Sequence, residues 1–139
     1  MVRILAIDYG TKRVGVAITD PLGFTAQGLP TIYTNGSDKK FLKAIEEIIK
    51  EKDVKEVVIG FPKHMNGDIS DKARKINEFI PQIEAMGVKV AKWDERLTTV
   101  ASYGIMKDLG IKQTQKNDYA DKLAATYILE GYMQRVKNS

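Results

Sequence analysis

Short apolar runs separated by turns open the chain. Residues 4–7 and 14–18 form two such runs, and the turn between them contains Gly10. Apolar runs of this kind, bounded by turn residues, are typical of buried strands, and glycine allows a tight reversal between them. Residues 24–33 mix β-branched, aromatic and polar side chains between two glycine-containing turns and predict a third strand. The chain is therefore expected to begin with three antiparallel strands.

After residue 37 the apolar positions take up helical spacing. Two segments with this spacing follow potential helix caps, which are Ser37 or Asp38 and then Ser70 or Asp71. Two further apolar runs predict buried strands. In chain order, the expected elements are a helix ending near Lys52, a strand over 57–61, a helix from 71 that Pro81 kinks and Gly87 closes, a strand over 88–93, and helices over 97–110 and 115–135.

This order of elements predicts an α/β fold. Antiparallel strands, followed by strands that alternate with helices, imply a mixed five-stranded sheet whose last strands are parallel and whose two faces carry helices. The 139 residues contain no internal repeat, low-complexity segment or linker, and they suit one domain over residues 1–139. In open sheets of this kind, ligands bind in the crevice at the carboxyl ends of the strands.

Composition narrows the range of functions. The chain has 22 Lys and Arg residues against 18 Asp and Glu, and this mild basic excess suits a polyanionic partner without requiring one. Cysteine is absent, which excludes disulfides, thiolate metal sites and a cysteine nucleophile. The first apolar run is too short for a signal peptide, and no later stretch approaches the length of a membrane span. A cytoplasmic protein without a membrane partner is expected.

Acidic residues from three parts of the chain converge in the predicted fold. Asp8 ends the first strand, and Asp94 and Glu95 follow the fifth. Asp121 lies on the sheet-facing stripe of the last helix, shortly before two alanines that allow close approach. An ionised carboxylate in such a place is costly to bury unless a cation or several donors pair with it. Adjacent strand residues face opposite ways, so only one of Asp94 and Glu95 is expected to join the group.

The predicted acidic group suits hard metal ions. Carboxylates in a chain without cysteine and with a single histidine are oxygen ligands for Mg²⁺ or Mn²⁺ rather than a Zn²⁺ site. Two such ions can activate water and stabilise the leaving oxygen of a phosphodiester, so hydrolysis of nucleic acid is the leading interpretation. Basic residues that could line a phosphate track, or could simply be solvated, are Lys12, Arg13, Lys63, Lys72, Arg74 and Lys75. Tyr9 and Trp93 could stack on bases or pack in the core.

The acidic residues also have structural interpretations. Asp8 fits a turn in which its carboxylate accepts hydrogen bonds from nearby backbone amides. Asp94 and Glu95 could be surface charges that pair with neighbouring basic residues. Asp118 lies three residues before Asp121 on nearly the same face, but its place in the first turn suits a helix-dipole role equally well.

Four motifs span nearly the whole chain. They are residues 8–17 (DYGTKRVGVA), residues 60–63 with 65–67 (GFPK and MNG), residues 94–99 (DERLTT), and Asp121 with positions 124–125 and 128–129 (AA and IL). In this order they closely resemble the motifs of the YqgF family, also called RuvX. The resemblance implies a ribonuclease H-like fold and nuclease activity. The family was first described as Holliday junction resolvases and later as the nuclease that matures the 5′ end of pre-16S ribosomal RNA.

The resemblance also implies the residues of the site. Asp8, Glu95 and Asp121 match the catalytic, metal-binding acids of the family, and Asp94 is the second choice for the middle position. The residues expected to bind substrate are Lys12, Arg13, Lys63, Asn66 and Arg96. Asn66 stands where the family commonly has an aspartate, a departure that does not touch the three acids.

Cofactor and partner follow from the same resemblance. The expected cofactor is Mg²⁺ or Mn²⁺, bound as two ions, and the expected partner is nucleic acid, either pre-ribosomal RNA or branched DNA. Ribosomal particles are a further expected partner. Both a monomer and a homodimer are compatible with the sequence, and a symmetric dimer would suit a four-way junction, in which two strands are cut.

Two other functions stay open at this point. A non-catalytic RNA-binding factor in ribosome assembly would keep the fold and bind without cutting. The hairpin around Asp8 also resembles the first phosphate-binding hairpin of the actin, Hsp70 and sugar-kinase superfamily. Those ATPases need two lobes, whereas this chain has no second strand-borne Asp-x-Gly and, at 139 residues, no room for a second lobe.

Overall fold

The computed structural model of the chain describes residues 2–62, 70–94 and 113–137, with the backbone alone described for 113–119 and 137. Its centre is a mixed sheet with strand order β3-β2-β1-β5-β6, in which β4 also pairs with β2. The strands are β1 (Arg3–Asp8), β2 (Arg13–Thr19), β3 (Ala26–Gly28), β4 (Ile32–Tyr33), β5 (Val54–Phe61) and β6 (Lys89–Asp94). Strand β2 is antiparallel to β1, β3 and β4, and β5 is parallel to β1 and β6. The predicted mixed α/β sheet is confirmed.

The predicted third strand over 24–33 differs from the structure. It is divided into the short strands β3 and β4, so the sheet has six strands among the described residues rather than five. Pro30 lies between them and has no amide hydrogen to donate to a ladder, which explains why pairing stops there.

Three helices flank the sheet in the described residues, α1 (Asp38–Glu51), α2 (Asp71–Glu84) and α4 (Gln113–Lys137). The hydroxyl of Ser37 accepts a hydrogen bond from the backbone N–H of Lys40, and that of Ser70 accepts one from Ala73, so both serines are N-caps. The helix α2 continues through Pro81 to Glu84. The helix expected over 97–110 lies outside the described residues. Within the described ranges, none of the helices has an apolar stretch long enough to cross a lipid bilayer.

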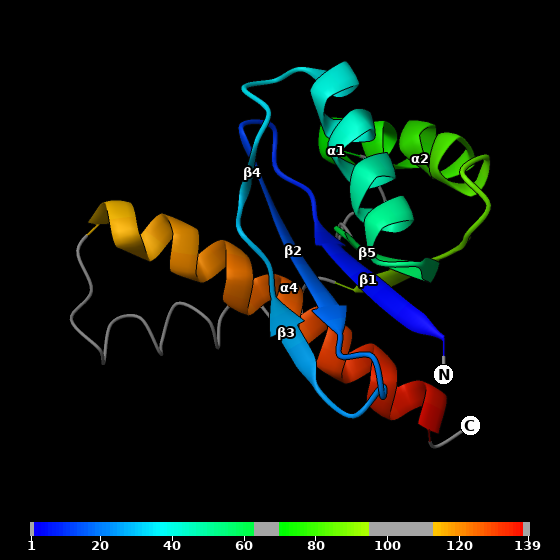
Figure 1. Cartoon of the computed structure of the whole chain (residues 1–139). Coiled ribbons are helices and arrows are strands. Elements are labelled where there is room, and N and C mark those ends of the chain that lie inside the picture. The colour runs from blue at the N-terminus through cyan, green and yellow to red at the C-terminus, as the bar shows by residue number, and fades with distance from the viewer. Residues whose placement is uncertain (1, 63–69, 95–112, 138–139) are drawn as a thin grey trace.

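The helices form a layer on each side of the sheet (Figure 1). Helices α1 and α2 cover one face, and α4 runs along the other. Side chains alternate along each strand, so Leu5 and Ile7 belong to the core under α1 and α2, whereas Ala6 belongs to a second core with Ala125 and Ile128 of α4. The strand residues under α4 are smaller, which allows that helix to lie close to the sheet.

Two glycines and one hydrogen bond hold α4 in place. A Cβ atom at Gly15 of β2 would lie 2.2 Å from the carbonyl oxygen of Asp121, and one at Gly131 would lie 2.6 Å from the ring of Trp93. Near the other end of the helix, the hydroxyl of Tyr132 donates to a carboxylate oxygen of Glu56 at 2.7 Å. The backbone of α4 therefore rests directly on β2 at the level of Asp121.

Candidate active site

Asp8 lies at the carboxyl end of β1 and faces α4. It is the last residue of the strand and pairs with Gly15 of β2. Because side chains alternate, Asp8 shares its face with Ala6, which packs under α4. Its other neighbour is Gly60 of β5, since the preceding residues, Ile7 and Ile59, are paired. The carboxylate is thus flanked on both neighbouring strands by residues that have no side chain.

Asp121 reaches the same place from α4. Its backbone contacts Gly15, the residue directly opposite Asp8, and its side chain is 17% exposed. Directly opposed residues of an antiparallel pair have Cα atoms about 5 Å apart, so the two acids approach each other across a single glycine. The next residues on the same stripe, Ala124 and Ala125, are buried. The expectation that Asp121 points to the sheet is confirmed.

Arg13 is the cationic partner of Asp121. Its Nε donates to Oδ2 of Asp121 at 3.1 Å, and its side chain is 38% exposed. Arg13 begins β2 two residues before Gly15, so it belongs to the same face of the sheet. The sequence suggested a phosphate-binding role for Arg13, but it did not indicate this pair. A partly exposed guanidinium beside the acids offsets part of the cost of burying Asp121 and stays within reach of solvent.

The register of β6 separates Asp94 from Asp8. Asp94 pairs with Phe61, which packs on the α1 and α2 side of the sheet. Trp93 pairs with Gly60 and packs on the α4 side. Asp94 therefore ends its strand at the expected edge but on the face opposite to Asp8. Of the other predicted site residues, Lys63, Asn66, Glu95 and Arg96 and the side chain of Asp118 lie outside the described residues.

The loop between β1 and β2 is tied to the turn before α1. The carbonyl oxygen of Lys12 accepts hydrogen bonds from the backbone N–H groups of Thr34 and Asn35, at 3.0 and 3.3 Å. The carbonyl of Thr11 accepts one from Gly36 at 2.8 Å. These contacts fix the backbone of the loop while the side chain of Lys12 remains exposed. Sequence reasoning missed these contacts, because the two segments are separated along the chain by β2, β3 and β4.

The aromatic residues near the acids serve packing. Tyr9 is 3% exposed, and its ring lies 5.1 Å from the rings of both Phe41 and Phe79. Trp93 packs against Gly131 of α4. Of the two interpretations that the sequence left open for Tyr9 and Trp93, core packing is therefore confirmed.

The donor set fits a hard divalent cation. Asp8 and Asp121 bring carboxylate oxygens to one face, and the absence of a side chain at Gly15 lets the backbone of Asp121 come close to the strand that pairs with Asp8. Such oxygen ligands suit Mg²⁺ or Mn²⁺. Among the described residues, no group of three His, Cys, Asp or Glu side chains comes together, and the third predicted acid lies beyond these residues. The structure thus brings together two members of the predicted triad.

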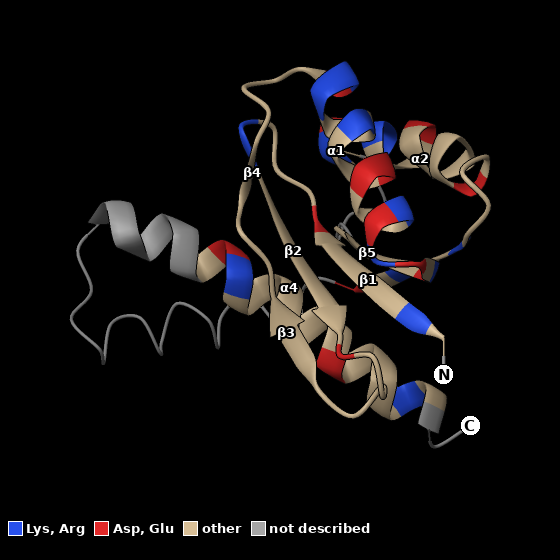
Figure 2. Cartoon of the chain, viewed as in Figure 1, with Lys and Arg blue, Asp and Glu red and all other residues tan. Residues whose placement is uncertain are grey.

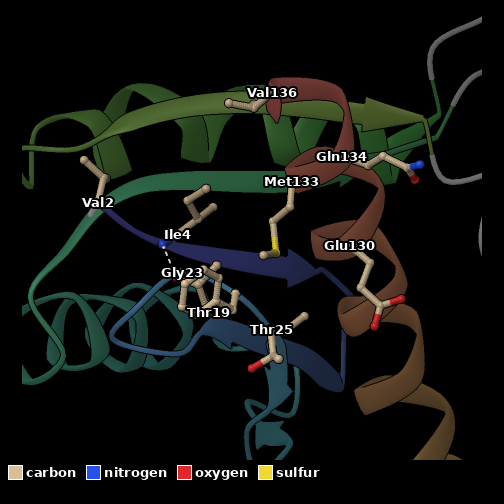
Figure 3. Close-up of a pocket in the computed structure, with 11 residues that line it drawn as sticks. Val2, Ile4, Thr19, Gly23, Thr25, Glu130, Met133, Gln134 and Val136 are labelled. Carbon is tan, nitrogen blue, oxygen red and sulfur yellow. Dashed lines mark hydrogen bonds between the residues drawn. The ribbon is translucent and has the colours of Figure 1, made fainter. Parts of the chain in front are cut away.

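A large hollow elsewhere has a different character (Figure 3). It has a volume of about 820 Å³ and lies between the beginning of β1, at Ile4, and the last turns of α4, at Met133. Glu130 is the one charged residue among the described residues that line it. Within it, the backbone N–H of Ile4 donates to the hydroxyl of Thr19 at 2.9 Å. Because Ile4 is at the opposite end of β1 from Asp8, this apolar hollow is separate from the acidic site.

The chain is similar in sequence to named nucleases over nearly its whole length. A family model described as "RuvX: Holliday junction resolvase" matches residues 2–135. Relatives from Ruminiclostridium cellulolyticum and Acetivibrio thermocellus are both 47% identical, over 135 and 133 residues. The alignments cover 96% and 94% of this chain and 95% and 94% of the relatives. Both relatives carry the name "Putative pre-16S rRNA nuclease".

Solved structures share the fold at low sequence identity. The structure of T. thermophilus RuvC in complex with a Holliday junction substrate has a TM-score of 0.60 and 14% identity, and covers 98% of this chain and 96% of that one. The Fowlpox virus resolvase in complex with Holliday junction DNA has a TM-score of 0.59 and 14% identity, with coverage of 97% and 99%. This likeness confirms the predicted ribonuclease H-like fold class.

Proposed function

This chain belongs to the RuvX family, and we propose that it is a metal-dependent nuclease that hydrolyses phosphodiester bonds during 5′-end maturation of pre-16S ribosomal RNA. The observation that carries the proposal is the contact of Asp121 with Gly15, which pairs with Asp8. A carboxylate at the end of a strand and a second one on the helix that covers the same face form an arrangement suited to divalent cations. In this proposal, residues 1–139 form one ribonuclease H-like domain.

We assign Asp8, Glu95 and Asp121 as the catalytic, metal-binding acids. Asp94 lies on the wrong face for this group, and alternation along a strand favours the next residue, Glu95. Bound Mg²⁺ or Mn²⁺, as two ions, would supply an activated water and stabilise the charge on the leaving oxygen. The chain itself contributes the placement of the carboxylates, because the strand pairing and the close packing of α4 hold Asp8 and Asp121 at a defined separation.

Basic residues around the acids would hold the substrate. Lys12 presents an exposed ammonium group from a braced loop, and it would bind a phosphate beside the cleaved bond. Arg13 positions the carboxylate of Asp121 through its hydrogen bond and is exposed enough to reach a phosphate oxygen as well. Lys63, Asn66 and Arg96 complete the substrate-binding set by resemblance to the family.

The choice of RNA as substrate is supported by the relatives. Those 47% identical over almost the whole chain are named for pre-16S ribosomal RNA, and ribosomal particles in the cytoplasm would be the setting of the reaction. Branched DNA is the second candidate, because the family description names Holliday junctions. Two strands of a four-way junction are cut, so this candidate would require a homodimer, whereas a monomer suffices for a single cut in RNA.

A cleavage experiment distinguishes these functions. Labelled pre-16S-like RNA and a labelled four-way DNA junction are incubated with the protein in Mg²⁺ or Mn²⁺, and wild type is compared with Asp8→Asn and Asp121→Asn. Metal-dependent cutting of the RNA alone, lost in both variants, is the expected result. Cutting of the junction alone would support the resolvase instead. Tight RNA binding without any cutting would contradict the nuclease and favour an assembly factor.

A further inference from the structure

The helices α1 and α2 share an unusual order of charges. In the first half of each helix, over 38–44 and 71–77, three basic residues stand against one acid. In the second half, over 45–51 and 78–84, acids outnumber basic residues. The basic residues of the two first halves are Lys39, Lys40 and Lys43 in α1 and Lys72, Arg74 and Lys75 in α2. Figure 2 shows the basic residues gathered toward the beginning of α1 and acidic residues further along it.

Apart from the acid in the first turn of each helix and Lys50 in the last turn of α1, this order is the reverse of the one that the helix dipole favours. The N-terminus of a helix carries a partial positive charge, so cations in the first turns are unfavourable there and acids near the C-terminus are unfavourable as well. The N-caps Ser37 and Ser70 and the first-turn acids Asp38 and Asp71 offset part of this cost. Arg74 pairs with Asp71 within α2, and Lys75 pairs with Asp38. Helix stability does not account for Lys39, Lys40 and Lys43, whereas an anionic partner would.

The basic beginnings of the two helices lie at one end of the molecule. The side chain of Lys75 pairs with Asp38 and so joins α2 to the first turn of α1. The turn that leads into α1 is bonded to the loop that carries Lys12, through the contact of Gly36 N–H with the carbonyl of Thr11. That loop follows directly on Asp8 along the chain. The basic surface is thus continuous with the end of the sheet where the acids lie.

The surface nevertheless belongs to the opposite face of the sheet. Asp8 and Asp121 lie under α4, whereas α1 and α2 cover the other side. We define the helix-start surface as Lys39, Lys40, Lys43, Lys72 and Arg74. A nucleic acid bound at Asp8 could reach it only with a segment that passes around the end of the sheet. Its side chains would therefore contact phosphates away from the bond that is cut.

Resting on the proposed nuclease function, we propose that the helix-start surface binds the phosphodiester backbone of a segment that flanks the cleavage point. Four of its five residues are lysines, which are point charges suited to phosphates rather than to the planar recognition of bases. Lys39, Lys40 and Lys43 are exposed and available for such contacts. The surface therefore supplies affinity and orientation without sequence preference.

The test compares two triple variants with the same change of charge. The first is Lys39→Gln, Lys40→Gln and Lys43→Gln. The control is Lys50→Gln, Lys55→Gln and Lys89→Gln, which lie in the last turn of α1 and at the beginnings of β5 and β6, at the opposite end of the molecule. Binding of a long and a short labelled RNA duplex, and of matching DNA duplexes, is measured without divalent ions across a range of salt concentrations.

The first variant is expected to bind the long duplexes about tenfold more weakly than the control. The slope of log Kd against log salt should also fall, by about one for each phosphate that the variant no longer neutralises. With the short duplex, which cannot span both regions, the two variants should differ little. Equal weakening in both variants, or a difference that persists with the short duplex, would overturn the proposal. The thermal midpoint of the first variant should equal or exceed that of wild type, because unfavourable helix charges are removed.

The binding assay and the cleavage assay test the two proposals independently. If the two triple variants differ in binding as predicted but the wild-type protein never cuts, the nuclease function is contradicted, and the role of the helix-start surface in binding is supported. If the protein cuts RNA but the two triple variants bind alike, the proposed nuclease function stands and the proposed role of the helix-start surface is wrong. The RNA and DNA arms show which backbone the surface holds more tightly.

Discussion

The carbonyl oxygen of Asp121 lies against Gly15, so close that a Cβ at that glycine would be 2.2 Å from it. Gly15 is also the strand partner of Asp8. One residue without a side chain thus sets the distance between a strand-borne acid and a helix-borne acid. The separation of the two carboxylates depends on this contact, because the packing of α4 on β2 determines the position of Asp121.

Gly15→Ala should therefore damage both stability and activity. The added methyl group meets backbone rather than a flexible side chain, so α4 must move away from β2 or β2 must bend. Overpacking of this kind costs about 2–3 kcal/mol of unfolding free energy. The displacement also carries Asp121 away from Asp8, and cleavage should fall by at least about 100-fold at temperatures where the variant is folded. Urea unfolding and the RNA cleavage assay measure the two effects.

Gly28→Ala is the matched control. Gly28 lies in the neighbouring strand β3, and a Cβ there would lie 3.4 Å from the Cβ of Lys122 in α4, an ordinary contact distance. The substitution should leave cleavage unchanged and stability equal or slightly higher, since alanine restricts the unfolded chain. Similar losses in both glycine variants would show that the strands tolerate no added side chain, and that the close approach at Gly15 has no special role.

Removal of either described acid should abolish metal-dependent cutting while the fold persists. Asp8→Asn and Asp121→Asn each remove one of the carboxylates that we propose bind the metal, and we expect cleavage to fall at least about 1,000-fold. Asp8→Asn should be as stable as wild type or more stable without metal, because it removes repulsion between like charges. Added Mn²⁺ should raise the thermal midpoint of wild type but not of these variants.

Asp94→Asn provides the comparison for these acids. Asp94 also ends a strand at this edge of the sheet, but it shares the face of α1 and α2. The variant should retain cleavage within about threefold of wild type and keep the stabilisation by Mn²⁺. Loss of both in Asp94→Asn would mean that Asp94, rather than Glu95, is the third metal ligand.

Local sequence patterns predicted most of the strands, and they predicted that Asp121 lies on the side of its helix that faces the sheet. The apolar run of β1 and the helical stripe of Ala124 and Ala125 are properties of neighbouring residues, and they persist in the fold. Pairing with β2 then sets Asp8 opposite Gly15, the residue that contacts Asp121. By contrast, the division of the third predicted strand follows from Pro30, whose missing backbone donor outweighs the strand-forming residues on either side of it.

The contacts that define the site could not be predicted in the same way. The pair Arg13 and Asp121 joins positions 108 residues apart, and the face of Asp94 depends on the register between β5 and β6. Alternation predicts that Asp94 and Glu95 face opposite ways, but only the register shows which face Asp94 occupies. Gly15 did carry a signal, since a glycine within a strand often marks close approach of another backbone.

Tyr132 should make the stability of the protein depend on alkaline pH. Burial, and then its hydrogen bond to Glu56, raise the pKa of Tyr132 to about 12 from an ordinary value of 10.0. Its folded pKa is thus above its unfolded pKa, so its contribution is complete below about pH 10 and is lost as the pH rises to about 12. At pH 7, Tyr132→Phe should lower the unfolding free energy by about 1–2 kcal/mol.

The difference between wild type and Tyr132→Phe should therefore narrow between pH 10 and 12. Urea unfolding at several pH values measures it, and subtraction of the two proteins removes the contribution of the lysines, which titrate in the same range. Tyr127→Phe, on the same helix, controls for the loss of a hydroxyl as such. A constant difference across this range would contradict the role of the Tyr132 proton in tying α4 to β5.

Arg13→Gln should strengthen metal binding and weaken substrate binding. The guanidinium donates to Asp121 at 3.1 Å, so it opposes a cation at the same carboxylate. Its removal should raise the affinity for Mn²⁺ about fivefold, corresponding to about 1 kcal/mol for one charge at a partly exposed site. The same change removes the phosphate contact that we propose for Arg13, so RNA should bind more weakly. Arg13→Lys keeps the charge and should leave the affinity for Mn²⁺ near that of wild type. It loses the planar, directional hydrogen bond to Asp121, so part of the cleavage rate should be lost as well.

Titration with Mn²⁺ followed by electron paramagnetic resonance, without nucleic acid, separates the effect of Arg13 on metal binding from its effect on substrate binding. If Mn²⁺ binds to Arg13→Gln and to wild type equally, the arginine does not compete with the metal, and its role is confined to the substrate.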